Sequence, residues 1–205
     1  MERRGMQNGF LGFIFGRQAD YIRSLTIPFA ICVSVFIFSL VIGYGIGDNI
    51  SQDVMDDLMG VFPNFENFDI TMFILFIVFN NVSKSFLFMI LGFVGSFPPL
   101  YFNIMNGFII GIFSYKFSIN YGLLITTAFL LPHGIIEIPT ILLSSAAGMR
   151  LGYKLINRLR GHGGVGVEFV MALRLFVSRI IPLLLLAAIV EVINTILMTI
   201  LFGIA

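Results

Sequence analysis

The fold is decided by residues 25–47, which read LTIPFAICVSVFIFSLVIGYGIG and contain no charged side chain. Arg23 precedes this stretch and Asp48 follows it. A helix of about 20 apolar residues is long enough to cross the hydrocarbon core of a bilayer, which is about 30 Å thick. We therefore interpret residues 25–47 as a transmembrane helix.

The composition of the whole chain also indicates a membrane protein. Of its 205 residues, 58% are apolar and only 11% are charged, whereas a soluble domain carries about 25% charged residues. Four more apolar stretches of spanning length follow, at about 70–95, 100–118, 121–148 and 175–205. The predicted fold class is all-α, a polytopic membrane helix bundle of about five transmembrane helices.

The distribution of charge predicts the orientation of the bundle. Basic side chains gather in residues 1–24 and 150–174, while residues 48–69 contain six carboxylates and no Lys or Arg. By the positive-inside rule, the N-terminus is cytoplasmic, 48–69 is an acidic outer loop and 150–174 is a basic cytoplasmic loop. We expect a cytoplasmic interfacial segment at 1–24 and a single transmembrane domain at 25–205, in a multi-pass protein of the cell membrane.

Prolines mark two places where the helices should be interrupted. Pro98 and Pro99 stand in the short connection between the second and third spans, where they predict a tight turn or a re-entrant hairpin. Pro132 and Pro139 lie inside the fourth span and predict a kinked or locally unwound segment.

Polar side chains inside the spans are the candidate functional residues, because each ionised one costs roughly 2.5 to 3.5 kcal/mol at the centre of a membrane helix. The helical rise brings the asparagines of the second span and His133 to a similar depth near the midplane. We therefore predict an intramembrane polar cluster. Its members are Asn80, Asn81, Lys84, Asn106, His133, Glu137 and Glu191, with Asn103 as a further polar residue of the third span.

His133 and Glu137 are four residues apart, so on one helix their side chains can touch. They could form a site for a divalent metal such as zinc, completed by an asparagine or a second subunit, or a proton-coupled pair. The HExxH pattern is absent, and the only other histidine, His162, lies in the predicted cytoplasmic loop. The other interpretation is structural, a hydrogen-bonded clamp between helices.

Two further features have alternative readings. Lys84 could neutralise a buried carboxylate, or it could extend its ammonium toward an interface. Small residues recur at a spacing of four, in Gly43 and Gly47, Gly107 and Gly111, and Ser144, Gly148 and Gly152. This spacing allows close approach of helices within the subunit, or association of two subunits into a homodimer.

Several of these segments resemble a known family. Residues 131–139, LPHGIIEIP, and 144–152, SSAAGMRLG, are similar to the signature of the stage II sporulation protein M family. Asn80–Asn81, Asn106–Gly107 and residues 186–191, LAAIVE, are similar to other recurring segments of that family, so the resemblance runs from about residue 20 to the end. The matching polar positions are Asn80, Asn106, His133, Glu137, Arg150 and Glu191.

The resemblance implies a polytopic membrane component that, in spore-forming bacteria, recruits cell-wall hydrolases during engulfment. It assigns no catalytic step to the matching positions. The sequence itself lacks a complete catalytic or ligand set, which favours a non-enzymatic role.

Two classes of function therefore follow from the sequence. The first is an integral membrane scaffold or partner-recruiting protein in which the polar cluster joins helices. The second is an ion- or ligand-handling transporter, or a metal-dependent intramembrane enzyme, that uses His133 and Glu137. The expected partners are the lipid bilayer, other membrane or envelope proteins and a second copy of the chain, and no nucleic acid.

Overall fold

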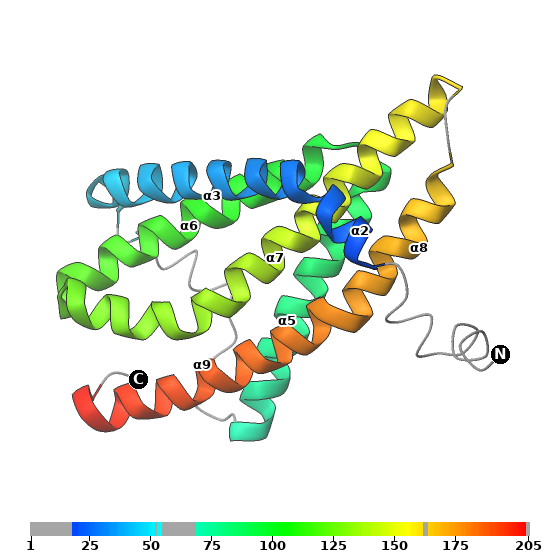
Figure 1. The fold of residues 1–205 in the computed structure, drawn as a ribbon. Helices are drawn as coiled ribbons and strands as arrows, with labels where there is room; N and C mark the ends of the chain where they lie inside the picture. Colours follow the sequence, from blue (N-terminus) through cyan, green and yellow to red (C-terminus); the bar gives the residue numbers. More distant parts are fainter. Residues whose placement is uncertain (1–17, 52, 55–68, 162–163, 204–205) are drawn as a thin grey trace.

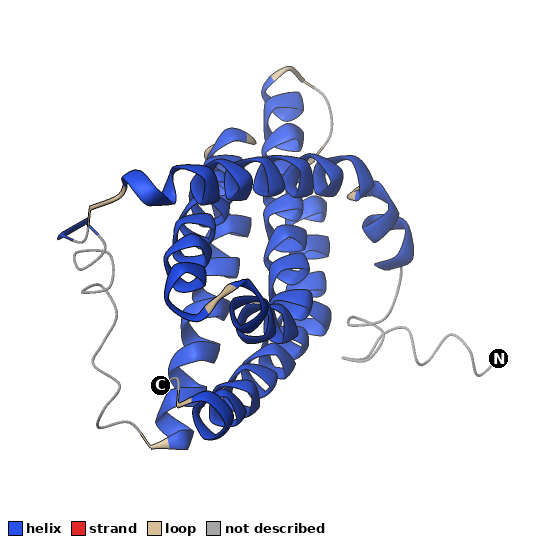
Figure 2. Cartoon of the chain, turned by 90° about the vertical axis from the view of Figure 1, so that its left-hand side faces the viewer, coloured by secondary structure: helices blue, strands red, loops and turns tan. Residues whose placement is uncertain are grey.

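The computed structural model describes residues 18–51, 53–54, 69–161 and 164–203. Residues 1–17 and most of the predicted acidic outer loop lie outside the described residues. Within the described part, the regular elements are helices and there is no strand (Figure 2).

The described residues contain five helical segments that are long and apolar enough to cross a membrane, as predicted. After the short helix α2 (Gln18–Ser24), they comprise α3 (Thr26–Ile46) with η2 (Gly47–Asn49), α5 (Ile70–Ile90) with η4 (Leu91–Phe93), α6 (Phe97–Tyr121), α7 (Leu123–Leu159), and α8 (Val165–Leu175), which continues through η5 (Phe176–Ile180) into α9 (Ile181–Phe202). The chain is a multi-pass membrane protein.

Local chemistry explains where these helices begin. The carboxylate of Asp69 caps α5 by accepting a hydrogen bond of 2.6 Å from the backbone N–H of Met72. Gly95, at φ +145°, turns the chain between η4 and α6. Pro98 and Pro99 occupy the first turn of α6, where a proline's missing N–H has no helical partner to lose. Of the two predicted alternatives, the structure has the tight turn, not the re-entrant hairpin.

Helix α7 agrees with one of the two predicted alternatives at its prolines, and it extends beyond the predicted end of the fourth span. The helix continues without unwinding through Pro132 and Pro139, because neighbouring helices support a proline-containing helix inside a bundle. Its course in Figure 1 is bent rather than straight. The helix also runs past the predicted end at Gly148 to Leu159, and α8 begins at Val165. The predicted loop at 150–174 is therefore largely a helical hairpin, because polar residues end a span without ending a helix.

Helix α7 is the centre of the bundle. It packs against α3, α5, α6, α8 and α9, and α3 and α6 form a second close pair beside it (Figure 1). The largest core cluster joins α5, α7, α8 and α9 through buried side chains that include Met89, Leu175, Ile180 and Leu184. The end of α7 and the start of α8 project beyond the other helices (Figure 1).

Glycines allow the closest helix contacts. A Cβ on Gly43, Gly107 or Gly111 would collide with the backbone of the partner helix in the α3–α6 pair, and one on Gly148 would collide with the backbone of α5. The small-residue spacing is thus used for packing within the subunit.

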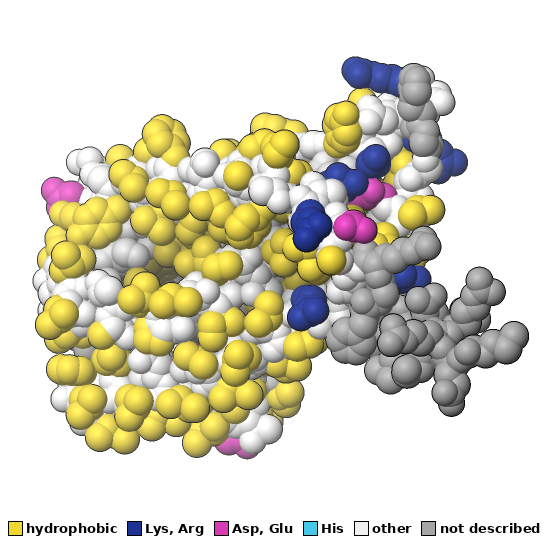
Figure 3. All heavy atoms as spheres, viewed as in Figure 1, with side chains coloured by type: hydrophobic (Ala, Val, Ile, Leu, Met, Phe, Trp, Pro, Cys, Tyr) yellow, Lys and Arg dark blue, Asp and Glu magenta, His cyan; other side chains and the backbone are white. Residues whose placement is uncertain are grey.

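The face drawn in Figure 3 is apolar over the body of the bundle. Large side chains such as Ile27, Phe79 and Ile200 are about three-quarters exposed, which is expected where lipid is the solvent. Lys and Arg side chains gather at one end, around α2 and the projecting α7–α8 hairpin (Figure 3). We call this the basic end.

Candidate functional site

Three ionisable side chains from three spans lie near one another inside the bundle. Lys84 on α5 is close enough to Glu137 on α7 and Glu191 on α9 to interact electrostatically with both. Asn81, buried on α5, lies within hydrogen-bonding reach of the Glu137 carboxylate. Of the alternatives for Lys84, this arrangement favours neutralisation of buried carboxylates.

The charges of this group do not balance. One ammonium faces two carboxylates, and the two carboxylates also interact with each other. Within the described part of the chain, the ion pair shorter than 4.0 Å is that of Arg150 with Glu168, so Lys84 acts on its partners from a greater distance. When all three groups are ionised, one negative charge is left in excess. A proton, a cation or nearby polar groups must offset it.

The remaining predicted members are placed less centrally. The amide of Asn80 donates to the side-chain oxygen of Asn81 at 3.4 Å, and so connects to the group through its neighbour. Asn106 is half-buried on α6, and no described contact joins it to the three ionisable groups. His133 lies one helical turn before Glu137 on α7, and its side chain is outside the described atoms.

Other polar side chains inside the bundle join pairs of helices. Asn103 on α6 donates to the carbonyl of Cys32 on α3 at 3.5 Å. Ser144 on α7 donates to the carbonyl of Ser85 on α5 at 2.6 Å. Asn194 on α9 donates to the carbonyl of Phe129 on α7 at 2.7 Å. We call these three bonds the helix clamps.

The predicted metal site has no complete ligand set among the described side chains. No group of three or more His, Cys, Asp or Glu side chains comes together in the ranges that the structure describes. Glu137 and Glu191 would supply two carboxylates, and a tetrahedral zinc site needs more protein ligands than that. The site at His133 and Glu137 stays a prediction.

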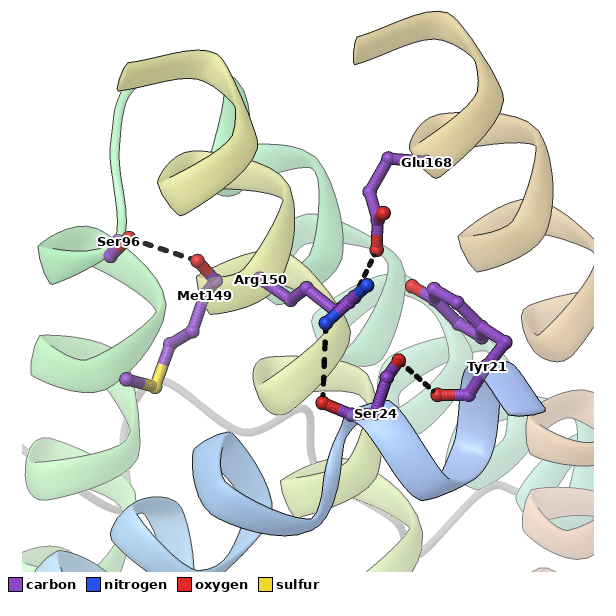
Figure 4. A network of polar contacts seen from close by, with 6 residues as sticks. All are labelled: Tyr21, Ser24, Ser96, Met149, Arg150 and Glu168. Carbon is purple, nitrogen blue, oxygen red and sulfur yellow. Dashed lines mark hydrogen bonds and ion pairs between the residues drawn. The ribbon is translucent and has the colours of Figure 1, made fainter. Parts of the chain in front are cut away.

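A second polar network lies at the basic end (Figure 4). The Nε of Arg150, on α7, forms an ion pair of 2.5 Å with Glu168 Oε1 on α8, and its Nη1 donates to the carbonyl of Ser24 at 3.3 Å. The guanidinium also lies 5.9 Å from the ring centroid of Tyr21. Arg150 therefore ties α2, α7 and α8 together.

Tyr21 is buried beneath this arginine. Its hydroxyl has no hydrogen-bond partner among the described residues. Burial is the main cause that raises the pKa of Tyr21 well above its ordinary value, with a smaller contribution from the negative charge of Glu168. The phenol is therefore neutral at physiological pH and keeps its donor.

Further bonds fix the elements around this network. The amide of Gln18 donates to Ser178 Oγ at 2.8 Å and so joins α2 to η5. Ser96 Oγ donates to the carbonyl of Met149 at 2.9 Å, which holds the turn before α6 against α7 (Figure 4). The basic end is thus an ordered arrangement of helix ends.

Sequence reasoning identified Arg150 by resemblance, but it missed Glu168 and Tyr21. One signal was present: Glu168 is the only acidic residue in the basic segment 150–174. An isolated carboxylate among cations is a natural ion-pair partner. No pattern in the sequence pointed to Tyr21, because its contact with Arg150 joins elements far apart in the chain.

Comparison with known proteins gives two matches. A family model described as stage II sporulation protein M matches residues 29–196. An uncharacterized protein of Methanocaldococcus jannaschii is 32% identical over 133 residues, which cover 63% of this chain and 71% of the relative. No solved structure matches the chain.

Proposed function

Because the chain belongs to the stage II sporulation protein M family, we propose that it acts as an integral membrane scaffold or partner-recruiting protein of the cell membrane. In this role the five spans form a fixed support, and other membrane or envelope proteins assemble on it. Homodimerisation would use a surface other than the glycines that already pack within the subunit.

The observation that carries this proposal is the set of helix clamps. Each clamp joins the side chain of one span to the backbone of another, at Asn103–Cys32, Ser144–Ser85 and Asn194–Phe129. Transporters work by movement of one group of helices against another. Clamps between α3 and α6, α5 and α7, and α7 and α9 resist such movement, and they support a static role.

The proposal can be tested with the purified chain in liposomes. A scaffold should pass no more protons across the membrane than empty liposomes do when a pH gradient is imposed. The variant Glu137→Gln should leave this background unchanged. A proton flux that the wild type shows and Glu137→Gln loses would contradict the scaffold.

Recruitment itself calls for a second measurement. After mild cross-linking in native membranes, the chain should migrate in a discrete complex with one other membrane or envelope protein in fixed stoichiometry. Migration only as a single chain or a homodimer would argue against partner recruitment.

The alternative function is the handling of an ion or a small ligand, by a transporter or a metal-dependent intramembrane enzyme. The observation that favours it is that Lys84, Glu137 and Glu191 are each half-buried rather than fully enclosed. Ionisable side chains within spans commonly mark ion pathways. The flux measurement tests transport, and elemental analysis of the purified chain for zinc tests the metal.

A further inference from the structure

An open groove of about 860 Å³ lies at the basic end, between α2 and α8. Arg150, on α7, also lines it, and the ion pair of Arg150 with Glu168 forms part of its wall. This volume is within the range of small-ligand sites in proteins, about 300 to 1,000 Å³. Neither the helix clamps nor the intramembrane charges involve this groove.

The groove lies at the level where the bilayer's phosphate groups begin. Arg150 contacts the carbonyl of Ser24, just before the start of α3. Helix α3 has 21 residues, and at 1.5 Å per residue such a helix is about 31 Å long, close to the thickness of the hydrocarbon core. Its first residue therefore lies near the edge of the hydrocarbon. A groove beside Ser24 faces phospholipid headgroups.

The lining offers both signs of charge. Arg150 and Arg174 carry positive charge suited to a phosphate, Asp20 carries negative charge suited to a cation or a hydrogen-bond donor, and Glu168 is paired with Arg150. The contacts of Arg150 use its Nε and Nη1, and no described contact uses its Nη2. Tyr21 also lines the groove, and its buried hydroxyl has no hydrogen-bond partner in the part of the chain that the structure describes.

The same groove has an apolar part. Val167 is 75% exposed and Val170 is 39% exposed on α8, and both line the groove. Inorganic phosphate would leave these side chains uncovered. The glycerol and upper acyl chain of a lipid would cover them.

From this combination we propose that the groove binds the headgroup of a phospholipid that carries a protonated amine beside its phosphate, such as phosphatidylethanolamine. Arg150 and Arg174 bind the phosphate, Asp20 accepts hydrogen bonds from the amine, and Val167 and Val170 contact the glycerol region. Arg150 is held in position by Glu168 and the Tyr21 ring. This site goes beyond the proposed scaffold function and does not depend on it.

Native mass spectrometry of the whole chain tests this proposal. The chain is released from nanodiscs that contain equal parts of phosphatidylcholine, phosphatidylethanolamine and phosphatidylglycerol. One phosphatidylethanolamine molecule should be retained in preference to the other two lipids. The quaternary ammonium of phosphatidylcholine cannot donate to Asp20, and phosphatidylglycerol brings no cation to it.

Three variants test which side chains of the groove contact the lipid. Arg174→Gln should lower lipid retention about tenfold, because a hydrogen bond to a charged group is lost. Asp20→Asn should abolish the preference for phosphatidylethanolamine over phosphatidylcholine and leave total retention nearly unchanged. Val170→Trp should narrow the apolar part of the groove and reduce retention of every lipid. Arg158→Gln, an exposed arginine outside the groove lining, is the matched control and should change nothing.

Folding is checked separately, by the melting temperature of each variant in detergent without lipid. Retention that is equal for the three lipids, or highest for phosphatidylglycerol, would overturn the proposal. So would displacement of the lipid by millimolar inorganic phosphate, which would indicate a site for free anions. Normal lipid retention by a folded Val170→Trp chain would show that the lipid binds elsewhere, and it would also overturn the proposal.

Discussion

Two interfaces of this bundle are built in opposite ways. Helices α3 and α6 meet through glycines, and Gly43, Gly107 and Gly111 each face the backbone of the partner helix. Helices α5, α7 and α9 meet around side chains that carry charge, Lys84, Glu137 and Glu191. The first interface has backbone against backbone, and the second has unbalanced charge on half-buried side chains.

The difference shows two solutions to one problem. Lipid is as apolar as a leucine side chain, so the hydrophobic effect does not drive one span against another. Close backbone packing gains dispersion energy at α3–α6. Polar side chains at α5–α7–α9 gain electrostatic and hydrogen-bond energy, at the cost of keeping ionisable groups away from water. A substitution that adds side-chain volume should therefore destabilise the α3–α6 interface, and one that increases the charge imbalance should destabilise the α5–α7–α9 interface.

The largest effect is expected from Gly111→Val. A Cβ at this position would collide with the carbonyl of Leu40 and the backbone nitrogen of Tyr44, and backbone atoms cannot move aside as side chains do. Unfolding free energy should fall by about 3 kcal/mol or more, measured by denaturant titration in detergent. The matched control is Gly45→Val on α3, where a Cβ meets nothing within 4 Å. Equal damage from both variants would contradict the packing argument.

Lys84→Met should have the next largest effect. It removes the one cation and leaves Glu137 and Glu191 facing each other, so we expect a loss of about 2 kcal/mol, below the range for a fully buried pair because the groups are half-buried. The same denaturant titration measures it. A variant as stable as the wild type would mean that Lys84 does not neutralise these carboxylates.

Glu168→Gln should cost less, about 1 kcal/mol, because the Gln amide oxygen can still accept a hydrogen bond from Arg150, whose side chain is 25% exposed. Limited proteolysis should then cut faster between α7 and α8. If this variant loses more stability than Lys84→Met, the charge inside the bundle contributes less to stability than the ion pair at the basic end does.

Glu191→Gln should change stability by no more than about 0.5 kcal/mol, or raise it. It removes the excess negative charge and leaves Lys84 with Glu137, a balanced pair. Glu191→Gln removes a negative charge and Lys84→Met removes a positive one, so comparison of their melting temperatures shows which charge stabilises the bundle. A loss as large as that of Lys84→Met would show that both carboxylates are needed.

Tyr21→Phe should have the smallest effect at neutral pH, because the deleted hydroxyl has no partner among the described residues. The variant should differ from the wild type in how its stability depends on pH. The pKa of Tyr21 is raised in the folded chain by burial, so the unfolded chain loses the proton first, and wild-type stability falls as pH rises above about 10. The variant should show a shallower fall in melting temperature between pH 9 and 11. Parallel curves would contradict the burial of this phenol.

The candidate site could be predicted only in part. Charge inside a span is visible in the sequence, and Lys84, Glu137 and Glu191 were identified in this way. Helical rise predicts a similar depth for Asn80, Asn81 and His133, but it predicts no direction around the helix axis. Asn106 is predicted as a member because it is a polar residue inside a span, and the structure describes no contact that joins it to the three ionisable groups. Arg150 and Glu168 pair across the α7–α8 hairpin, whose helices the prediction treated as a loop.

The amino-acid sequence alone determined that the chain is a bundle of about five membrane helices, because an apolar run of spanning length in lipid must satisfy its own backbone hydrogen bonds and so must be helical. The tertiary structure decided which helices meet: α3 with α6 through glycines, and α5, α7 and α9 around one lysine and two glutamates. Contacts between spans depend on the rotation of each helix about its axis. That rotation is set by packing against neighbours that lie far away in the sequence.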